Sequence, residues 1–147
     1  MDVLDEEVKE FQLRLEAILK EFLEQGSIEV YGNLKIVVTS FDRPNRIAFL
    51  KGNTIYVSVR ARRYPDFVLR YIIAHELAHL AVKRHTWRFW KIVGIIYPEY
   101  EKGKEELLRI AREELMKKQA HASGAVVLSY GLPPHLPALH DKPHRAG

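Results

Sequence analysis

The sequence predicts an α+β fold: an N-terminal helix, a small three-stranded sheet with a hairpin, three further helices and an extended C-terminal tail. Three observations support this class. A stripe of apolar residues at helical spacing opens the chain, β-branched and apolar runs follow over residues 34–59, and helical patterning returns over residues 65–118. With 147 residues, the chain fits a single domain.

The first helix is predicted from six apolar residues whose spacings alternate between four and three. They are Leu4, Val8, Phe11, Leu15, Ile18 and Phe22. This helix ends near Gly26, because glycine is enriched just after helix C-termini. Residues 34–41 then predict a strand, and the turn-forming residues 42–45 follow it. Two short strands, residues 46–50 and 54–59, are joined through Lys51-Gly52-Asn53 and predict a hairpin.

Pro65 and Asp66 mark the start of a second helix, predicted to run to about Arg84. Thr86 is expected to cap a third helix, which stops before Pro98. The last helix, residues 101–118, is rich in Glu paired three or four residues from Lys or Arg. Residues 119–147 hold four of the seven prolines and only three charged residues. We therefore expect a domain over residues 1–118 and a tail over residues 119–147 that is helical at most in its first few residues.

Composition excludes several classes of protein. The absence of cysteine excludes a disulfide scaffold, a thiol nucleophile and a Cys-ligated zinc or iron–sulfur site. The longest apolar stretch, residues 71–82, falls short of the roughly 20 residues that a bilayer requires. The acidic N-terminus lacks the pattern of a signal peptide. The expectation is a cytoplasmic protein without a membrane-spanning segment.

Charge is unevenly distributed along the chain. Residues 2–24 carry eight acidic and three basic residues, whereas residues 43–91 carry eleven basic and two acidic ones. Solvated Arg and Lys side chains on outer faces would explain the basic region, and so would attraction of an acidic partner or substrate.

The motif that carries chemistry is His75-Glu76-Leu77-Ala78-His79, inside the second predicted helix. Four residues advance a helix by about 400°, so the two imidazoles share one face and can bind one metal ion. Zinc with neutral nitrogen ligands lowers the pKa of its water to about 7, and a carboxylate such as Glu76 can take the proton. The motif predicts one Zn²⁺ per chain and metal-assisted hydrolysis of amide bonds.

A catalytic zinc usually has a third protein ligand, and His85 is the predicted one. On an unbroken helix, His85 would lie about 240° from His79, so the helix must end near Lys83 or Arg84 and the chain must turn back. If His85 were only a helix-cap residue, three carboxylates would be the next candidates: Glu99, Glu101 and Glu105.

Residues 75–90, HELAHLAVKRHTWRFW, have the pattern HExxHxxxxxH followed by an aromatic pair. This segment resembles the minigluzincins, small soluble zinc peptidases, and the wider SprT-like group. The resemblance covers about residues 1–118 and implies a gluzincin-like zincin domain with His75, His79 and His85 on zinc and Glu76 as general base and acid. It also implies latency, because family members are held as zymogens by their C-terminal segments.

Two related groups fit less well. Metzincins place Gly where this chain has Val82, and they need a downstream Met-turn, whereas Met1 and Met116 are the only methionines here. A family of zinc-dependent RNA-maturation nucleases spaces three histidines in the same way but has Gly in place of Glu76. The carboxylate therefore favours hydrolysis of peptides.

An extended peptide or an unfolded protein is the expected substrate. The third predicted strand is expected to be the sheet edge that faces the cleft, so Thr54, Ile55, Tyr56 and Val57 would bind substrate as an added strand. The apolar segment 125–130 of the tail could occupy the same edge as an intramolecular ligand. Side chains of the tail could also displace the water on zinc: His121, His135, His140, His144 and Asp141.

Two other functions compete with this one. A nucleic-acid-associated zinc hydrolase, either a nuclease or a SprT-like protease acting on DNA-bound substrates, would use the basic surface of residues 43–91. However, few aromatic residues interleave with those basic residues, and Trp87 and Trp90 are expected to fill the core. A non-catalytic metal-binding module is the third reading, and the presence of Glu76 argues against it. For the oxyanion, the chain offers three candidates: Tyr97, Tyr100 and Arg88.

Overall fold

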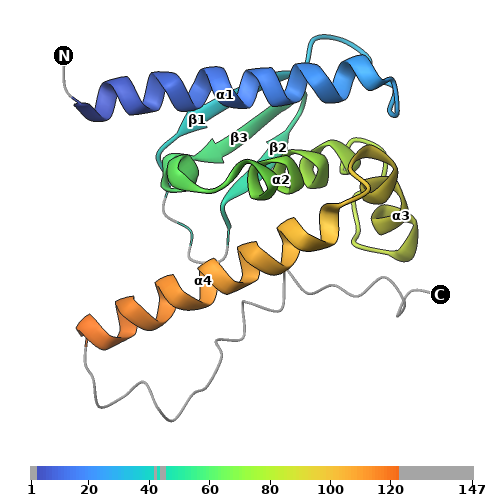
Figure 1. The fold of residues 1–147 in the computed structure, drawn as a ribbon. Helices are drawn as coiled ribbons and strands as arrows, with labels where there is room; N and C mark the ends of the chain where they lie inside the picture. Colours follow the sequence, from blue (N-terminus) through green and yellow to red (C-terminus); the bar gives the residue numbers. More distant parts are fainter. Residues whose placement is uncertain (1–2, 42, 44–45, 123–147) are drawn as a thin grey trace.

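The computed structural model describes residues 3–41, 43 and 46–122, and its architecture confirms the α+β class. The elements follow in the order α1 (Val3–Gln25), β1 (Lys35–Thr39), β2 (Ala48–Lys51), β3 (Thr54–Ser58), the 3₁₀ helix η1 (Val59–Arg63), α2 (Asp66–Ala78), α3 (Trp87–Ile96) and α4 (Tyr100–Ala122). Helix α2 is central in the fold. The sheet and α1 lie on one side of it, and α4 lies on the other side (Figure 1).

The sheet has the strand order β1-β3-β2, so β3 is its central strand. The predicted hairpin is confirmed, because β2 pairs with β3 in antiparallel orientation. The prediction that Thr54, Ile55, Tyr56 and Val57 form a free edge is wrong. Strand β1 pairs with β3 in parallel orientation from Lys35↔Thr54 to Thr39↔Ser58, and this pairing covers the second side of β3. The two edges of the sheet are β1 and β2.

A side chain of α1 blocks the outer edge of β1. The Gln12 amide donates from Nε2 to the carbonyl of Ile36 at 2.7 Å, and its Oε1 accepts from the N–H of Val38 at 2.8 Å. Both backbone groups lie on the outer edge of β1, where an added strand would bind, because the backbone groups of residues two apart point to the same side of a strand. The β1 edge is therefore already paired, which protects it from another chain.

The second helix ends earlier than predicted. Helix α2 stops at Ala78 instead of continuing to about Arg84. Beyond it, the N–H groups of Leu80 and Ala81 bond to carbonyls three residues back, at Leu77 and Ala78, so the chain leaves the helix through tight turns. The predicted cap of the next helix is present, because Thr86 accepts from the N–H of Phe89 at 3.4 Å.

Helix α4 continues past Lys118 to Ala122. The predicted tail beyond it, including the apolar segment 125–130, lies outside the described residues, as does most of the predicted turn at 42–45. None of the helices within the described residues combines the length and apolar character needed to cross a membrane.

The core forms where α1, the inner face of the sheet and α2 meet. The α1 stripe supplies Phe11, Leu15, Ile18 and Phe22, all buried, whereas Leu4 at the start of the stripe is exposed. Nine of the thirteen residues of α2 are buried, because other elements cover this helix on several sides. A helix held on several sides fixes its side chains firmly, and α2 carries the HExxH motif.

Gly103 allows α4 to approach α2 closely. A Cβ atom at this position would lie 2.6 Å from the carbonyl oxygen of Phe67 and 2.6 Å from Cβ of Tyr71. We expect Gly103→Ala to lower the free energy of unfolding by about 1–3 kcal/mol, because overpacking outweighs the roughly 1 kcal/mol gained in helix propensity. Urea denaturation would measure this loss.

Gly94 in α3 provides the matched control. Its Cβ would meet nothing closer than a ring carbon of Tyr100 at 3.4 Å. Gly94→Ala should therefore leave stability unchanged or raise it slightly. Equal stability of the two variants would contradict the role given to Gly103.

Candidate metal centre and active-site cleft

His75 and His79 lie one turn apart at the C-terminal end of α2, so both imidazoles project from the same face of this buried helix. His85 reaches the same place from outside the helix. After the tight turns that follow Ala78, the N–H of Thr86 donates to the carbonyl of Arg84 at 2.8 Å, and the chain reverses around His85. The break needed to bring His85 back to the motif is present, although it begins before Lys83.

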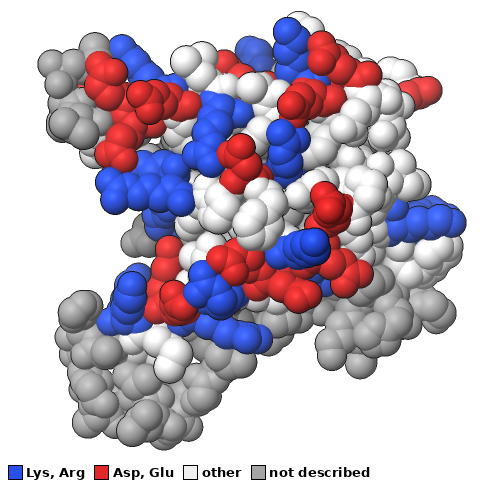
Figure 2. All heavy atoms as spheres, viewed as in Figure 1, with Lys and Arg blue, Asp and Glu red and all other residues white. Residues whose placement is uncertain are grey.

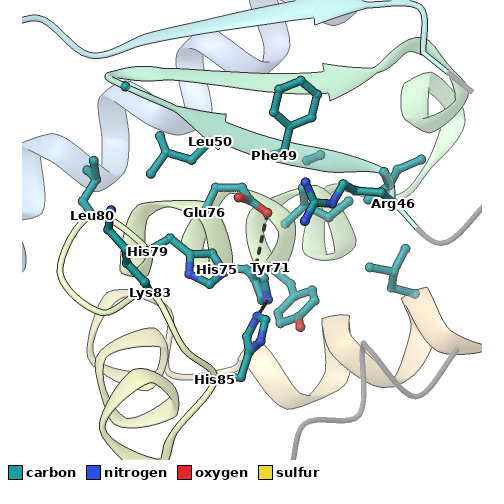
Figure 3. A pocket seen from close by; sticks show the side chains of 15 residues that line it. Arg46, Phe49, Leu50, Tyr71, His75, Glu76, His79, Leu80, Lys83 and His85 are labelled. Atoms are coloured by element: carbon teal, nitrogen blue, oxygen red, sulfur yellow. Dashed lines mark hydrogen bonds and ion pairs between the residues drawn. The ribbon is translucent and has the colours of Figure 1, made fainter. Parts of the chain in front are cut away.

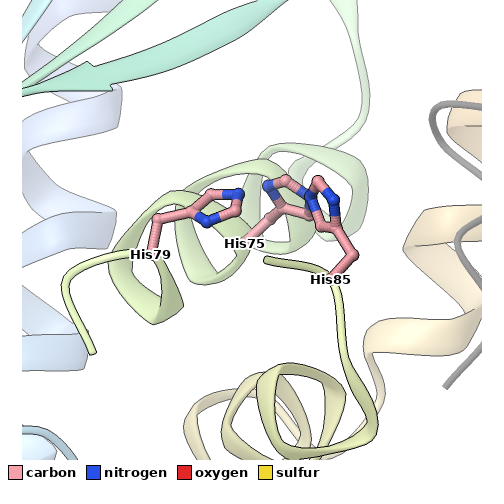
Figure 4. A group of neighbouring side chains, drawn as sticks. All are labelled: His75, His79 and His85. Atoms are coloured by element: carbon pink, nitrogen blue, oxygen red, sulfur yellow. The ribbon is translucent and has the colours of Figure 1, made fainter. Parts of the chain in front are cut away.

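The three imidazoles surround one small volume (Figure 4). Each can offer one ring nitrogen such that the three atoms lie within 4.8 Å of one another, and Nε2 of His85 is 3.2 Å from Nε2 of His75. A tetrahedral zinc ion with bonds of about 2.0–2.1 Å holds its ligand nitrogens roughly 3.3 Å apart. The arrangement therefore fits a three-histidine metal site that keeps a fourth position for another ligand.

Neighbouring groups select the nitrogen that each histidine on α2 offers. Nδ1 of His79 lies 3.1 Å from the carbonyl oxygen of Val82, and Nδ1 of His75 lies 3.1 Å from Oε2 of Glu76. A proton on Nδ1 satisfies both contacts and leaves each Nε2 able to bind a metal. Burial, followed by the charge of His75, lowers the pKa of the His79 imidazole. A lowered pKa favours the neutral ring, which is the form that binds a metal.

Two aromatic side chains of α3 form the wall behind the histidines. Phe89 is fully buried, and its ring centre lies 4.5 to 5.0 Å from those of all three imidazoles. Trp90 is 2% exposed and lies beside His75 and His85. Trp90 fills the core as expected, but Trp87 does not, because it is 47% exposed. The wall restricts the rotation of the rings and keeps water from one side of the site.

Glu76 is buried, with 6% of its surface exposed, and it lies beside the histidines at a cleft of about 550 Å³ (Figure 3). The opposite wall of the cleft is β2, from which Ala48, Phe49 and Leu50 contribute. A carboxylate that faces a metal site in a partly apolar cleft is placed to accept a proton from water bound there.

The structure separates the other sequence candidates from this cleft. Among the described residues, the cluster that can hold a metal contains the three histidines and none of Glu99, Glu101 and Glu105. The described residues that line the cleft also do not include Tyr97, Tyr100 or Arg88. Tyr100 instead stacks on Trp90, with ring centres 5.8 Å apart.

Several residues of the cleft were missed by the sequence reasoning. Tyr71 lines it, and its position one helical turn before His75 was a usable signal, because residues four apart share a helix face. Arg46, Leu50 and Lys83 also line it. No local pattern marked these three, since they meet only through the packing of β2 against the end of α2.

Comparison with known protein families agrees with this chemistry. Residues 49–110 match the family model described as "YgjP-like, metallopeptidase domain". The matched interval contains the three histidines and Glu76, and it supports a zinc metallopeptidase. A search of curated proteins and a search of solved structures found no match.

Proposed function

We propose that this chain is a zinc-dependent metalloendopeptidase that binds one Zn²⁺ through His75, His79 and His85 and uses Glu76 as its general base. The observation that carries the proposal is the convergence of three imidazoles beside a buried carboxylate in an open cleft. The metallopeptidase match over residues 49–110 supports it. The resemblance of residues 75–90 to the minigluzincins agrees with the same assignment.

The chain's own residues divide the work of hydrolysis. The three histidines hold the ion as neutral ligands, and the Phe89–Trp90 wall keeps their rings in place. Bound zinc would polarise the substrate carbonyl and acidify a water molecule at its open position. The Glu76 carboxylate takes a proton from the attacking water and returns it to the departing amine. Its contact with Nδ1 of His75 orients the carboxylate in the cleft.

We assign the binding of substrate to the outer edge of β2 rather than to β3. The N–H of Ser58 donates to the carbonyl of Ile47 at 2.8 Å, so antiparallel alternation turns the backbone groups of Ala48 and Leu50 outward. Both residues line the cleft. Gln12 occupies the other edge of the sheet, at β1. An extended peptide therefore pairs with β2 and passes the metal site, which favours unfolded segments and cleavage at internal bonds.

Removal and restoration of the metal test the proposed function. Dialysis of the full chain against a chelator is expected to abolish cleavage of an unfolded protein such as reduced, alkylated casein. Added Zn²⁺ should restore the activity at about one equivalent per chain, whereas Mg²⁺ should not, because it prefers oxygen ligands. Undiminished cleavage by metal-free protein would refute a metallopeptidase.

We also propose that residues 123–147 keep the enzyme latent. The apolar segment 125–130 is suited to pair with the β2 edge, and its tether gives it a high effective concentration, on the order of millimolar. A chain ending at Ala122, which preserves α4, should cleave unfolded protein several-fold faster than the full chain. A synthetic peptide of residues 123–147 should then inhibit it. Equal activities, with no inhibition by the peptide, would show that the tail has no regulatory role.

A further inference from the structure

The charged residues of the cleft are strongly unbalanced. Among the described residues that line it, Glu76 is the one carboxylate, whereas Arg46 and Lys83 are cationic. Figure 3 shows Arg46 at one end of the cleft and Lys83 at the other, beside Leu80 and His79. Since Glu76 is committed to the proposed chemistry, the charges that the described lining offers a bound peptide at the two ends of the cleft are both positive.

Neither cation is neutralised by the part of the protein that the structure describes. Arg14, Arg70 and Arg109 each form an ion pair with an acidic side chain. Arg46 and Lys83 are exposed, and within the described ranges neither has an ion-pair partner within 4.0 Å. Both cations are therefore available to an anionic group of a ligand.

The backbone that carries Arg46 is held in place by a buried anchor. The guanidinium of Arg60 donates from Nη2 to the carbonyls of Arg43 and Arg46, at 3.1 and 2.7 Å. Arg60 in turn donates from its backbone N–H and from Nε to Oγ of Ser58, which is fully buried. The N–H of Arg46 closes the turn by donating to the carbonyl of Arg43 at 3.2 Å. The backbone of Arg46 is therefore anchored just before β2.

The wall between the two cations is apolar. Leu50 of β2 and Leu80 beyond α2 contribute to it, whereas the ring of Phe49 points to the opposite face of the sheet and stacks on Tyr56 at 4.9 Å (Figure 3). A peptide strand along β2 would thus pass Arg46 at the start of the strand, then apolar surface, and then Lys83 near Leu50 and Leu80. Strand residues advance about 3.3 Å each, so the two cations meet side chains several positions apart.

We propose that the cleft selects extended peptides that carry Asp or Glu on both sides of the scissile bond, recognised by Arg46 and Lys83. This inference rests on the proposed peptidase function and names its substrate class. Attraction between opposite charges in a partly enclosed cleft favours acidic side chains and repels Lys and Arg at the same positions.

Nucleic acid is the other polyanion that these cations could attract, and the lining of the cleft favours a peptide. On the face seen in Figure 2, the described Lys and Arg side chains alternate with Asp and Glu. The cleft cations are separated by apolar side chains next to the outward-facing backbone of β2, whereas a bound nucleic acid strand meets a row of cations along its phosphates.

Matched peptides test the inference on the zinc-loaded full chain. Three internally quenched, unstructured peptides share one sequence and carry Glu, Gln or Lys at the positions that flank the cleaved bond on each side. At 150 mM salt we expect kcat/KM to be about five- to tenfold higher for the Glu peptide than for the Gln peptide, and lowest for the Lys peptide. Arg46→Glu with Lys83→Glu should reverse this order. Arg84→Gln, an exposed neighbour of Lys83 outside the cleft, should preserve it.

A binding measurement keeps this inference separate from the proposed activity. Labelled, uncleaved Glu, Gln and Lys peptides are titrated into the Glu76→Gln protein, and fluorescence anisotropy should give the same order of affinity. Equal affinities or equal rates for the three peptides would overturn the charge preference while leaving a peptidase intact. No cleavage of any peptide by either the full chain or the chain ending at Ala122, together with tighter binding of the Glu peptide, would refute the peptidase function alone. The peptide assignment would be overturned if a single-stranded oligonucleotide bound more tightly than the Glu peptide and Arg46→Glu abolished that binding.

Discussion

Replacing Glu76 with Gln is expected to reduce peptide hydrolysis by about 10²- to 10⁴-fold while zinc stays bound. The amide has the same shape as the carboxylate but cannot accept a proton from water. The amide oxygen can still accept a hydrogen bond from Nδ1 of His75, as the carboxylate does in the structure at 3.1 Å. The measurement is kcat/KM on an unfolded substrate, taken together with the zinc content of the same preparation.

Glu105→Gln is the matched control for this prediction. Glu105 is exposed on α4, lies outside the cleft, and is one of the carboxylates that the sequence offers as an alternative ligand. This variant should keep both zinc and activity. Activity above about a tenth of the original in Glu76→Gln would remove Glu76 from the role of general base. A loss of zinc from that variant would instead indicate that the carboxylate supports the metal site itself.

The central motif of this site could be predicted because it is local. His75, Glu76 and His79 occupy one turn of a helix, and helical geometry alone places them together. The end of that helix could not be predicted in the same way. Neither Gly nor Pro follows Ala78, and apolar residues continue through Leu80 and Val82, so the sequence pattern continues past the point where the helix stops.

The order of the strands depends on distant pairing, which the sequence did not indicate. The third strand was expected at the edge because it comes last before α2, but parallel β1 covers its second side. Gln12 bonds to backbone groups of β1 that lie 24 and 26 positions further along the chain, and no motif marks such a contact. The free sheet edge at the cleft, and with it the proposed substrate edge, is therefore β2 rather than β3.

His85→Ala is expected to remove zinc from the protein, because a site with two imidazoles lacks the third ligand that a catalytic zinc needs. Loss of a residue that only hydrogen-bonds to a metal ligand lowers metal affinity by roughly 10- to 100-fold. Loss of the ligand His85 itself should lower zinc affinity by more than this. His85 is the most informative of the three histidines, since it lies outside α2 and joins the site only through the turn that precedes Thr86. Metal analysis after dialysis against buffered free zinc measures the loss.

Thermal unfolding gives an independent readout of the same prediction. Zinc at 100 times its dissociation constant should stabilise the original protein by about 2.7 kcal/mol, and this zinc-dependent gain should vanish in His85→Ala. Arg84→Ala is the control, because it changes the adjacent exposed side chain and keeps the backbone carbonyl to which Thr86 donates. Full zinc content in His85→Ala would eliminate this residue as a ligand. Since the other candidate carboxylates lie outside the cluster, the third ligand would then have to come from a part of the chain beyond the described residues, or from the rearrangement of a described one.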